Sequence, residues 1–142
     1  MAKKNLQEEQ LKRALADYQN LKKRVESERL EFVKYVLEQF LLKLLPVVDD
    51  LEAAEAHIKD QGLTLAVDKL KTILNEEGVK EMNLLNQVFD PKLAECLELA
   101  PGKKDQVVSV AQKGYLLNDK VLRPARVKVG KGDLWAKLSA LI

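Results

Sequence analysis

The chain has 142 residues with 24 basic and 22 acidic side chains, which gives a formal net charge of +2. Because the positive and negative charges nearly cancel, there is no electrostatic reason to expect nucleic-acid binding. One Trp, three Tyr and three Phe also offer few aromatic rings on which bases could stack. The longest apolar cluster runs from Phe40 to Val48 and is interrupted by Lys43 and Pro46, so it is too short to span a membrane.

The chain starts with Met-Ala-Lys-Lys, which is not a secretory signal, and it contains one cysteine, Cys96. A single cysteine excludes an internal disulfide and fits a reducing compartment. We therefore expect a cytoplasmic protein in which Cys96, beside Leu97, is a small packing residue.

Residues 1–45 are predicted to form one long helix, because all six glycines and all four prolines lie further along the chain. At about 1.5 Å per residue such a helix is roughly 60 Å long and extends beyond any core that this chain can build around it. Apolar residues recur every seven positions, as in one half of a coiled-coil seam, and the companion positions are partly charged. The first set is Leu11, Tyr18, Val25 and Phe32, and the second is Leu15, Lys22, Arg29 and Val36. We expect this helix to pair with another chain through a thin seam, and the pattern indicates a solvated face at Lys22, Lys23 and Arg24.

Pro46 is expected to stop or kink this helix, because proline lacks an N–H and crowds the preceding turn. Residues 46–78 then have the pattern of two short amphipathic helices that end at Gly62 and Gly78, where helix C-terminal glycines belong. A two-helix hairpin alone buries too little apolar surface, so pairing with the same hairpin of a second chain predicts a homodimer with a four-helix bundle. The apolar positions assigned to this interface are Leu44, Val48, Leu51, Leu70, Ile73 and Leu74.

Residues 79–130 are predicted to form a small β domain, since the hydrophobic period changes to two and turn residues appear. The runs 107–112 and 121–129 alternate, and Asn118-Asp119 between two apolar runs predicts a tight hairpin turn. Pro124 within the second run indicates an edge strand or a bulge.

Two further features complete the expected layout. Pro101-Gly102 is expected to form a turn. In the tail, residues 131–142, Asp133 as a possible N-cap and the apolar Trp135 indicate a short amphipathic helix. The expected fold class is therefore α+β, with a long helix, a helical hairpin and a small β domain.

No group of residues indicates chemistry. Catalysis needs a placed nucleophile, acid, base or metal, whereas His57 and Cys96, the one histidine and the one cysteine, fall in different expected domains. The Gly-Lys pairs at 102–103 and 130–131 lack the upstream glycine of a P-loop. We therefore expect a protein that is not an enzyme and that carries no metal and no cofactor.

The segment Gln112–Val129, QKGYLLNDKVLRPARVKV, resembles the C-terminal signature of the GrpE family. The resemblance continues upstream, in the family's order, in Asp17–Arg24 (DYQNLKKR), Leu44–Glu52 (LLPVVDDLE), Gly78-Val79 and Phe89–Pro91 (FDP). GrpE proteins are homodimeric nucleotide exchange factors of the bacterial chaperone DnaK, with a long paired helix, a four-helix bundle and small β wings. The resemblance thus implies the layout that the residue patterns also predict.

The resemblance implies a co-chaperone whose β wing binds the nucleotide-binding domain of a DnaK-type chaperone and promotes ADP release without making or breaking a bond. By positional match it assigns chaperone contacts to Lys120 beside the hairpin turn, to Val129, to Lys23 and Arg24, and to Gly62. GrpE proteins are also regarded as thermosensors, which the thin seam favours. From the residue patterns alone, Val129 also fits a core position, Gly62 a helix cap and the basic pair a solvated face. The same patterns are open to a coiled-coil scaffold whose β domain binds another protein.

Overall fold

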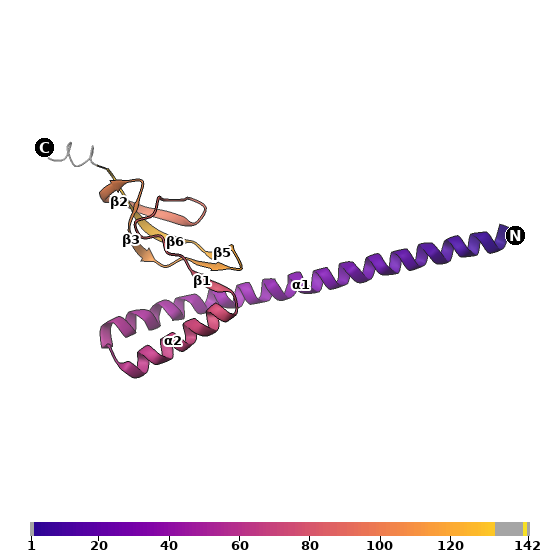
Figure 1. The fold of residues 1–142 in the computed structure, drawn as a ribbon, viewed down its shortest axis with the longest axis horizontal. Helices are drawn as coiled ribbons and strands as arrows, with labels where there is room; N and C mark the ends of the chain where they lie inside the picture. Colours follow the sequence, from indigo (N-terminus) through magenta and orange to yellow (C-terminus); the bar gives the residue numbers. More distant parts are fainter. Residues whose placement is uncertain (1, 133–140, 142) are drawn as a thin grey trace. The chain divides into compact units, whose positions relative to one another are not determined.

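Helix α1 covers Ala2–Ile58 in the computed structural model, which describes residues 2–132 and 141 (Figure 1). Asp133 and Trp135, on which the expected C-terminal helix rests, lie outside the described residues. The chain divides into two units, one up to Phe40 and the other from Leu41 onward. The helical conformation of the first unit confirms the expected long helix. Every described residue of this unit as far as Val36 is exposed, so this part of α1 has no core of its own.

α1 continues through Pro46, so the expected end of the helix at this proline is wrong. Proline at position 46 removes the N–H that would bond the carbonyl of Leu42, but Pro46 lies on the exposed side of the helix, where water can hydrate that carbonyl. Leu45 and Val48, on either side of it, are 0% and 1% exposed. Packing around the proline therefore outweighs its cost of about 3 kcal/mol in a helix interior.

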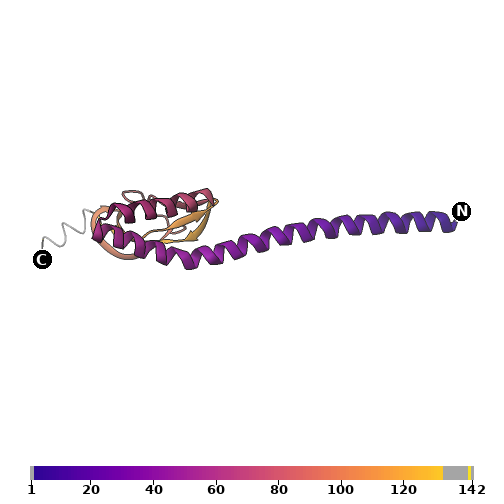
Figure 2. The same ribbon diagram turned by 90° about the horizontal axis from the view of Figure 1, so that it is seen from below.

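α1 ends twelve residues after the proline, and α2 covers Gln61–Glu76. Lys59 takes a left-handed conformation with φ 55°, and Asp60 caps α2 by accepting the N–H of Gly62 at 3.2 Å. Gly62 therefore lies in the first turn of α2 and does not end the preceding helix, contrary to expectation. Gly78 fulfils its expected role, because it follows the end of α2 with φ +88°. Figure 2 shows the last part of α1 and α2 side by side as a helical hairpin.

The described residues contain six strands in two three-stranded sheets, which confirms the α+β class. The first sheet is antiparallel and has the order β1–β4–β5, formed by Val79–Glu81, Tyr115–Leu117 and Lys120–Arg123. The second has the order β2–β6–β3, formed by Ala94–Lys104, Ala125–Gly130 and Val107–Gln112. In it β6 runs parallel to β2 and antiparallel to β3. We call Val79–Gly130 the wing.

Two prolines of the wing lie where the ladders are interrupted. Pro124 separates β5 from β6, so the run 121–129 is two strands in different sheets, and β6 is the central strand of its sheet rather than an edge. Pro101 and Gly102 lie within β2, an edge strand, at an irregularity in its pairing with β6, so the turn expected there is wrong. A proline can occupy an edge strand because its missing N–H need not pair.

The core of the wing lies on the second sheet. Its buried members are Ala94, Val107, Ala125, Val127 and Val129, with Leu84, Phe89 and Val110 packed against them. Cys96 is exposed, so its expected role as a packing residue is wrong. The burial of β2 does not alternate: Ala94 is buried, whereas the residues after it, including Cys96, are exposed as far as the half-buried Ala100.

Candidate functional site

The hairpin of β4 and β5 presents a cation directly after its turn. Asn118 and Asp119 have φ values of 47° and 69°, and two consecutive positive φ angles are typical of a type I′ turn. Lys120 follows this turn, is exposed and pairs with Leu117 across the hairpin. The expected tight turn is thus confirmed, and the position of Lys120 is set by backbone geometry.

Val129, the second assigned residue of the wing, is 4% exposed and belongs to the core of the β2–β6–β3 sheet. Its side chain faces the interior, as the core interpretation of the pattern has it. A surface role for this position would therefore pass through the backbone and the shape of β6 and not through direct contact by the side chain.

The other assigned contacts lie on the helices. Lys23 and Arg24 are exposed residues of the first unit, and the guanidinium Nε of Arg24 lies 3.7 Å from Glu28 Oε1 with both side chains about two-thirds exposed. An ion pair as exposed as this contributes little to stability, so these cations remain accessible to a partner. Gly62 is exposed in the first turn of α2, and a Cβ added there meets only the Asp60 carboxylate, at 3.8 Å.

Sequence reasoning missed an ion pair that joins α1 to the wing. Arg123 at the end of β5 donates from Nη1 to Asp49 Oδ2 at 2.7 Å and from Nη2 to Asp49 Oδ1 at 3.0 Å. The same guanidinium donates from Nε to the carbonyl of Lys113 at 3.1 Å. The two partners are 74 residues apart, so no local spacing could have indicated the pair.

A second group of charges lies beside this pair. The ammonium of Lys113 lies 2.7 Å from Glu52 Oε2 and 3.2 Å from Glu81 Oε1, and the ammonium of Lys71 lies 3.2 Å from Glu52 Oε1. Burial alone would lower the pKa of Lys113, but the hydrogen bonds and charges of Glu52 and Glu81 outweigh it and hold this pKa above its ordinary value. These pairs link α1, α2, β1 and the segment that enters β4.

Tyr115 lies in the middle of the same region. It pairs with Glu81 of β1 on one side and with Arg123 of β5 on the other, and the Arg123 guanidinium carbon lies 5.2 Å from the centre of its ring. Burial, followed by the charges of Glu52, Glu81 and Asp49, raises the pKa of the Tyr115 phenol to about 12. Its hydroxyl is buried without a hydrogen-bond partner among the described residues.

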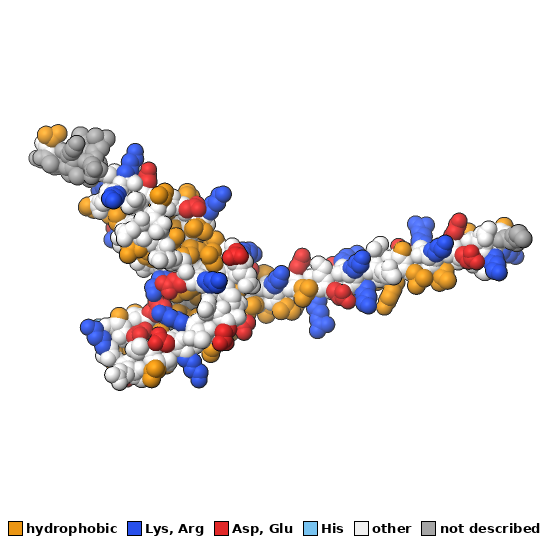
Figure 3. Space-filling view, viewed as in Figure 1, with side chains coloured by type: hydrophobic (Ala, Val, Ile, Leu, Met, Phe, Trp, Pro, Cys, Tyr) orange, Lys and Arg blue, Asp and Glu red, His pale blue; other side chains and the backbone are white. Residues whose placement is uncertain are grey.

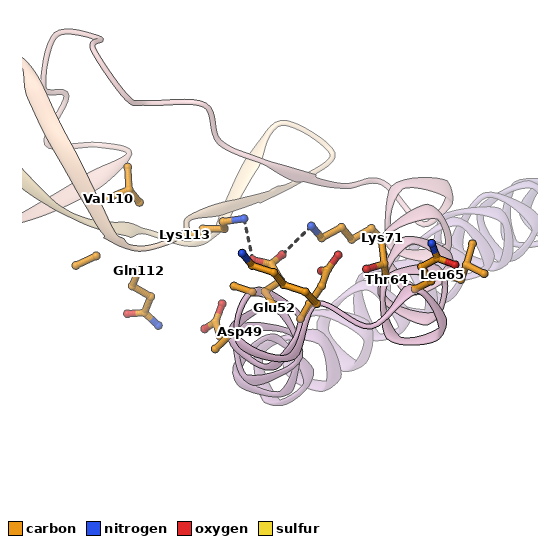
Figure 4. A pocket seen from close by; sticks show the side chains of 14 residues that line it. Asp49, Glu52, Thr64, Leu65, Lys71, Val110, Gln112 and Lys113 are labelled. Atoms are coloured by element: carbon orange, nitrogen blue, oxygen red, sulfur yellow. Dashed lines mark ion pairs between the residues drawn. The ribbon is translucent and has the colours of Figure 1, made fainter.

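An open groove lies between the helical hairpin and β3 (Figure 4). The groove is lined by Asp49 and Glu52 from α1, by Lys71 from α2 and by Val110 from β3. The dashed lines in the figure mark the ion pairs of Glu52 with Lys71 and Lys113. Of its charged side chains, Glu52 pairs with Lys71 and Lys113, and Asp49 pairs with Arg123. Within the part of the chain that the structure describes, no three His, Cys, Asp or Glu side chains are grouped so that they could hold a metal ion.

The residues assigned to a dimer interface divide into two classes. Val48 and Leu74 are buried within the single chain, at 1% and 6% exposure, so they stabilise the chain's own fold. Ile73 is 47% exposed, and Leu44, Leu51 and Leu70 are half-buried. Helical spacing places Leu44, Leu51 and the exposed Val47 on one side of α1, and Leu70 and Ile73 on one side of α2. The hairpin therefore retains an apolar outer face.

The first unit also presents apolar side chains to solvent, and Figure 3 shows them at intervals along the length of α1. Leu11, Tyr18, Val25 and Phe32, the expected seam, are all at least half exposed. None of the helices in the described residues is long and apolar enough to cross a membrane.

Comparison with known proteins matches nearly the whole chain to one family. A family model described as GrpE matches residues 1–131. The chain is 39% identical over 127 residues to Protein GrpE of Caldanaerobacter subterraneus subsp. tengcongensis. The matched region covers 84% of this chain and 62% of that protein. The chain belongs to the GrpE family. Two further GrpE relatives are those of Methanosphaera stadtmanae, with 39% identity over 130 residues and coverage of 87% and 75%, and Campylobacter fetus subsp. fetus, with 38% over 142 residues and coverage of 89% and 79%.

This GrpE chain thus spans between 62% and 79% of the length of these three relatives. Proteins of the GrpE family are homodimeric co-chaperones that act as nucleotide exchange factors of DnaK. Membership confirms the resemblance carried by Gln112–Val129 and the upstream segments.

Proposed function

We propose that this chain is a homodimeric nucleotide exchange factor that binds the nucleotide-binding domain of a DnaK-type chaperone and promotes ADP release. The observation that carries the proposal is the match of the GrpE family model to residues 1–131, which includes the long helix, the helical hairpin and the wing. The cytoplasmic location expected from the sequence belongs to the same proposal.

The proposed mechanism is differential binding. The wing binds the chaperone better when its nucleotide cleft is open than when it is closed, so complex formation shifts the chaperone toward the state that holds ADP poorly. By linkage, nucleotide binding lowers the affinity of the chaperone for the exchange factor to the same extent. A thousandfold effect on ADP affinity requires about 4 kcal/mol of differential binding, which a few wing contacts can supply.

In this proposal Lys120 is the principal charged contact of the wing. It is exposed beside a rigid turn, where a cation can meet an acidic surface of the chaperone. Val129 contributes by holding β6 in the core, while Lys23, Arg24 and Gly62 are exposed positions for further contacts on the helices.

The proposed dimer covers the outer face of the helical hairpin and the apolar seam of α1. Two copies of the hairpin can form a four-helix bundle through Leu44, Leu51, Leu70 and Ile73. This pairing also gives the apolar side chains of the first unit a partner, since that unit has no core in the single chain.

The test is the rate at which a DnaK-type chaperone releases a fluorescent ADP, measured by stopped flow with and without the chain. We expect the rate to rise with the concentration of the chain and then to saturate. A chain that forms a complex with the chaperone and leaves the release rate unchanged is a scaffold and not an exchange factor.

A further inference from the structure

The wing is joined to the helical hairpin at three separate places. The first is the chain itself, which passes from α2 through Gly78 directly into β1. The second is the ion pair between Asp49 of α1 and Arg123 of β5, which we call the Asp49–Arg123 clamp. The third is the ion pair between Glu52 of α1 and Lys113, whose side chain is 39% exposed, against 11% for Arg123. The chain alone leaves a pivot, and each ion pair restricts rotation about it.

The clamp has the geometry of a specific contact. Arg123 donates through two nitrogens to the two carboxylate oxygens of Asp49, and its third nitrogen, Nε, donates to the carbonyl of Lys113. A planar, bidentate arrangement of this kind fixes direction as well as distance, and lysine cannot reproduce it. The Arg123 side chain is 11% exposed, compared with 56% for Arg126, which lies 3.9 Å from Glu95 on the outside of the same wing.

The surrounding charges are balanced and lie on the same side of the wing. Asp49 and Glu52 are three residues apart on α1 and therefore share one face of the helix. Glu52 pairs with Lys113, which in turn pairs with Glu81 of β1. The strands β1 and β5, at the two edges of the first sheet, are thus both connected to the carboxylates of α1.

We propose that Asp49 and Arg123 are positioning residues that hold the wing in one orientation on the helical hairpin and thereby set how well it engages the chaperone. This inference rests on the function proposed above. Without the clamp, the wing retains its covalent link at Gly78 and the more exposed Glu52–Lys113 pair, which together restrict its rotation less. The surface that includes Lys120 then spends only part of its time in the orientation that binds. A lower fraction of binding-competent chains raises the concentration needed for half-maximal exchange and leaves the maximal rate unchanged.

The first measurement uses the protein without chaperone. Spin labels at Asp68→Cys on α2 and Lys92→Cys on the wing, in a Cys96→Ser background, report the distance between hairpin and wing by pulsed electron spin resonance. Dilution with unlabelled chain restricts the signal to pairs within one chain. We expect one narrow distance distribution in the parent and a clearly broader one in Asp49→Asn and in Arg123→Lys.

The second measurement is ADP release over a range of concentrations of the chain. We expect both variants to raise the half-maximal concentration about tenfold, equal to about 1.4 kcal/mol, at an unchanged maximal rate. Glu95→Gln, which removes the exposed Arg126 pair of the same wing, is the matched control and should behave as the parent. Asp49→Glu, which keeps a carboxylate, should recover part of the affinity.

The outcomes separate the inference from the function on which it rests. Distance distributions that match the parent in both clamp variants overturn the inference, and so do broadened distributions with an unchanged half-maximal concentration. If the parent itself fails to accelerate ADP release, the proposed function is wrong, while the distances still decide whether the clamp orients the wing. Circular dichroism of each variant checks that it is folded, and Arg123→Lys serves as the test if Asp49→Asn unfolds.

Discussion

The backbone N–H of Asn118 donates to the carbonyl oxygen of Gly78 at 3.1 Å, so the turn of the β4–β5 hairpin is attached to the connection between α2 and β1. Gly78 has φ +88°, a backbone conformation that residues with a Cβ rarely adopt. A Cβ at this position would also clash with the Asn118 side chain. The position of the Lys120 turn therefore depends on a glycine more than forty residues earlier.

Gly78→Ala should lower the free energy of unfolding by about 1–2 kcal/mol, because alanine is strained in the left-handed region. The control is Gly62→Ala, which should raise it by about 0.5–1 kcal/mol, since Gly62 lies in the first turn of α2 without a positive φ and an added Cβ would meet only the Asp60 carboxylate, at 3.8 Å. Urea unfolding of both variants measures the two changes. Equal effects at the two glycines would contradict this account of the α2 terminus.

Stability should fall as the pH rises from about 10 toward 12. Tyr115 keeps its proton in the folded chain up to a pKa of about 12, whereas the unfolded chain loses it near the ordinary value of 10.0. The raised pKa of Lys113 acts in the same direction, because the unfolded chain again loses its proton first. Urea unfolding at a series of alkaline pH values measures the decline.

Tyr115→Phe should make this decline shallower and should cost little at neutral pH, since the hydroxyl has no hydrogen-bond partner among the described residues. During an alkaline titration, the absorbance of tyrosinate should show a late ionisation step, that of Tyr115, in the parent and not in Tyr115→Phe. A variant with the same alkaline slope as the parent would assign the pH dependence to Lys113 alone.

Ile73→Asp should prevent dimerisation while the single chain stays folded. Ile73 is 47% exposed in one chain, so an aspartate there is hydrated in the monomer but becomes a buried, unpaired charge in a four-helix bundle. Sedimentation gives the mass, and Thr72→Asp at the neighbouring exposed position is the control. A stable dimer of Ile73→Asp would remove this face from the interface.

Heating should unpair the helices of the first unit before the wing unfolds. The seam gains little per turn, because Lys22 and Arg29 occupy companion positions of its apolar column, and a long helix without a packed face is only marginally stable. Replacing Lys22 and Arg29 with Leu should raise the first transition in circular dichroism and leave the second unchanged. One cooperative transition in the parent, with helix and wing lost together, excludes a thermosensor of this kind.

Local patterns predicted the parts of the fold that depend on local chemistry. The helical composition of residues 1–45, the Asn118-Asp119 turn and the end of α2 before Gly78 all follow from propensities of neighbouring residues. Pro46 was mispredicted because its cost is outweighed by the burial of Leu45 and Val48, which depends on tertiary packing.

The candidate site could be predicted only in part. Lys120 follows from its turn, but the Asp49–Arg123 clamp joins residues 74 positions apart, and nothing in either local sequence indicates the other. Val129 fits both a contact and a core position in the pattern, and burial in the structure is what separates them.

The central claim is most directly tested by stopped-flow release of fluorescent ADP from a DnaK-type chaperone, with the parent chain, Lys120→Glu and Lys92→Glu compared in one series. We predict that the parent accelerates release and that Lys120→Glu requires at least about tenfold more protein, a loss of about 1.4 kcal/mol, because charge reversal replaces attraction by repulsion. Lys92→Glu, an equal charge change elsewhere on the wing, should match the parent. An unchanged release rate with the parent, at concentrations where the complex forms, would contradict the account.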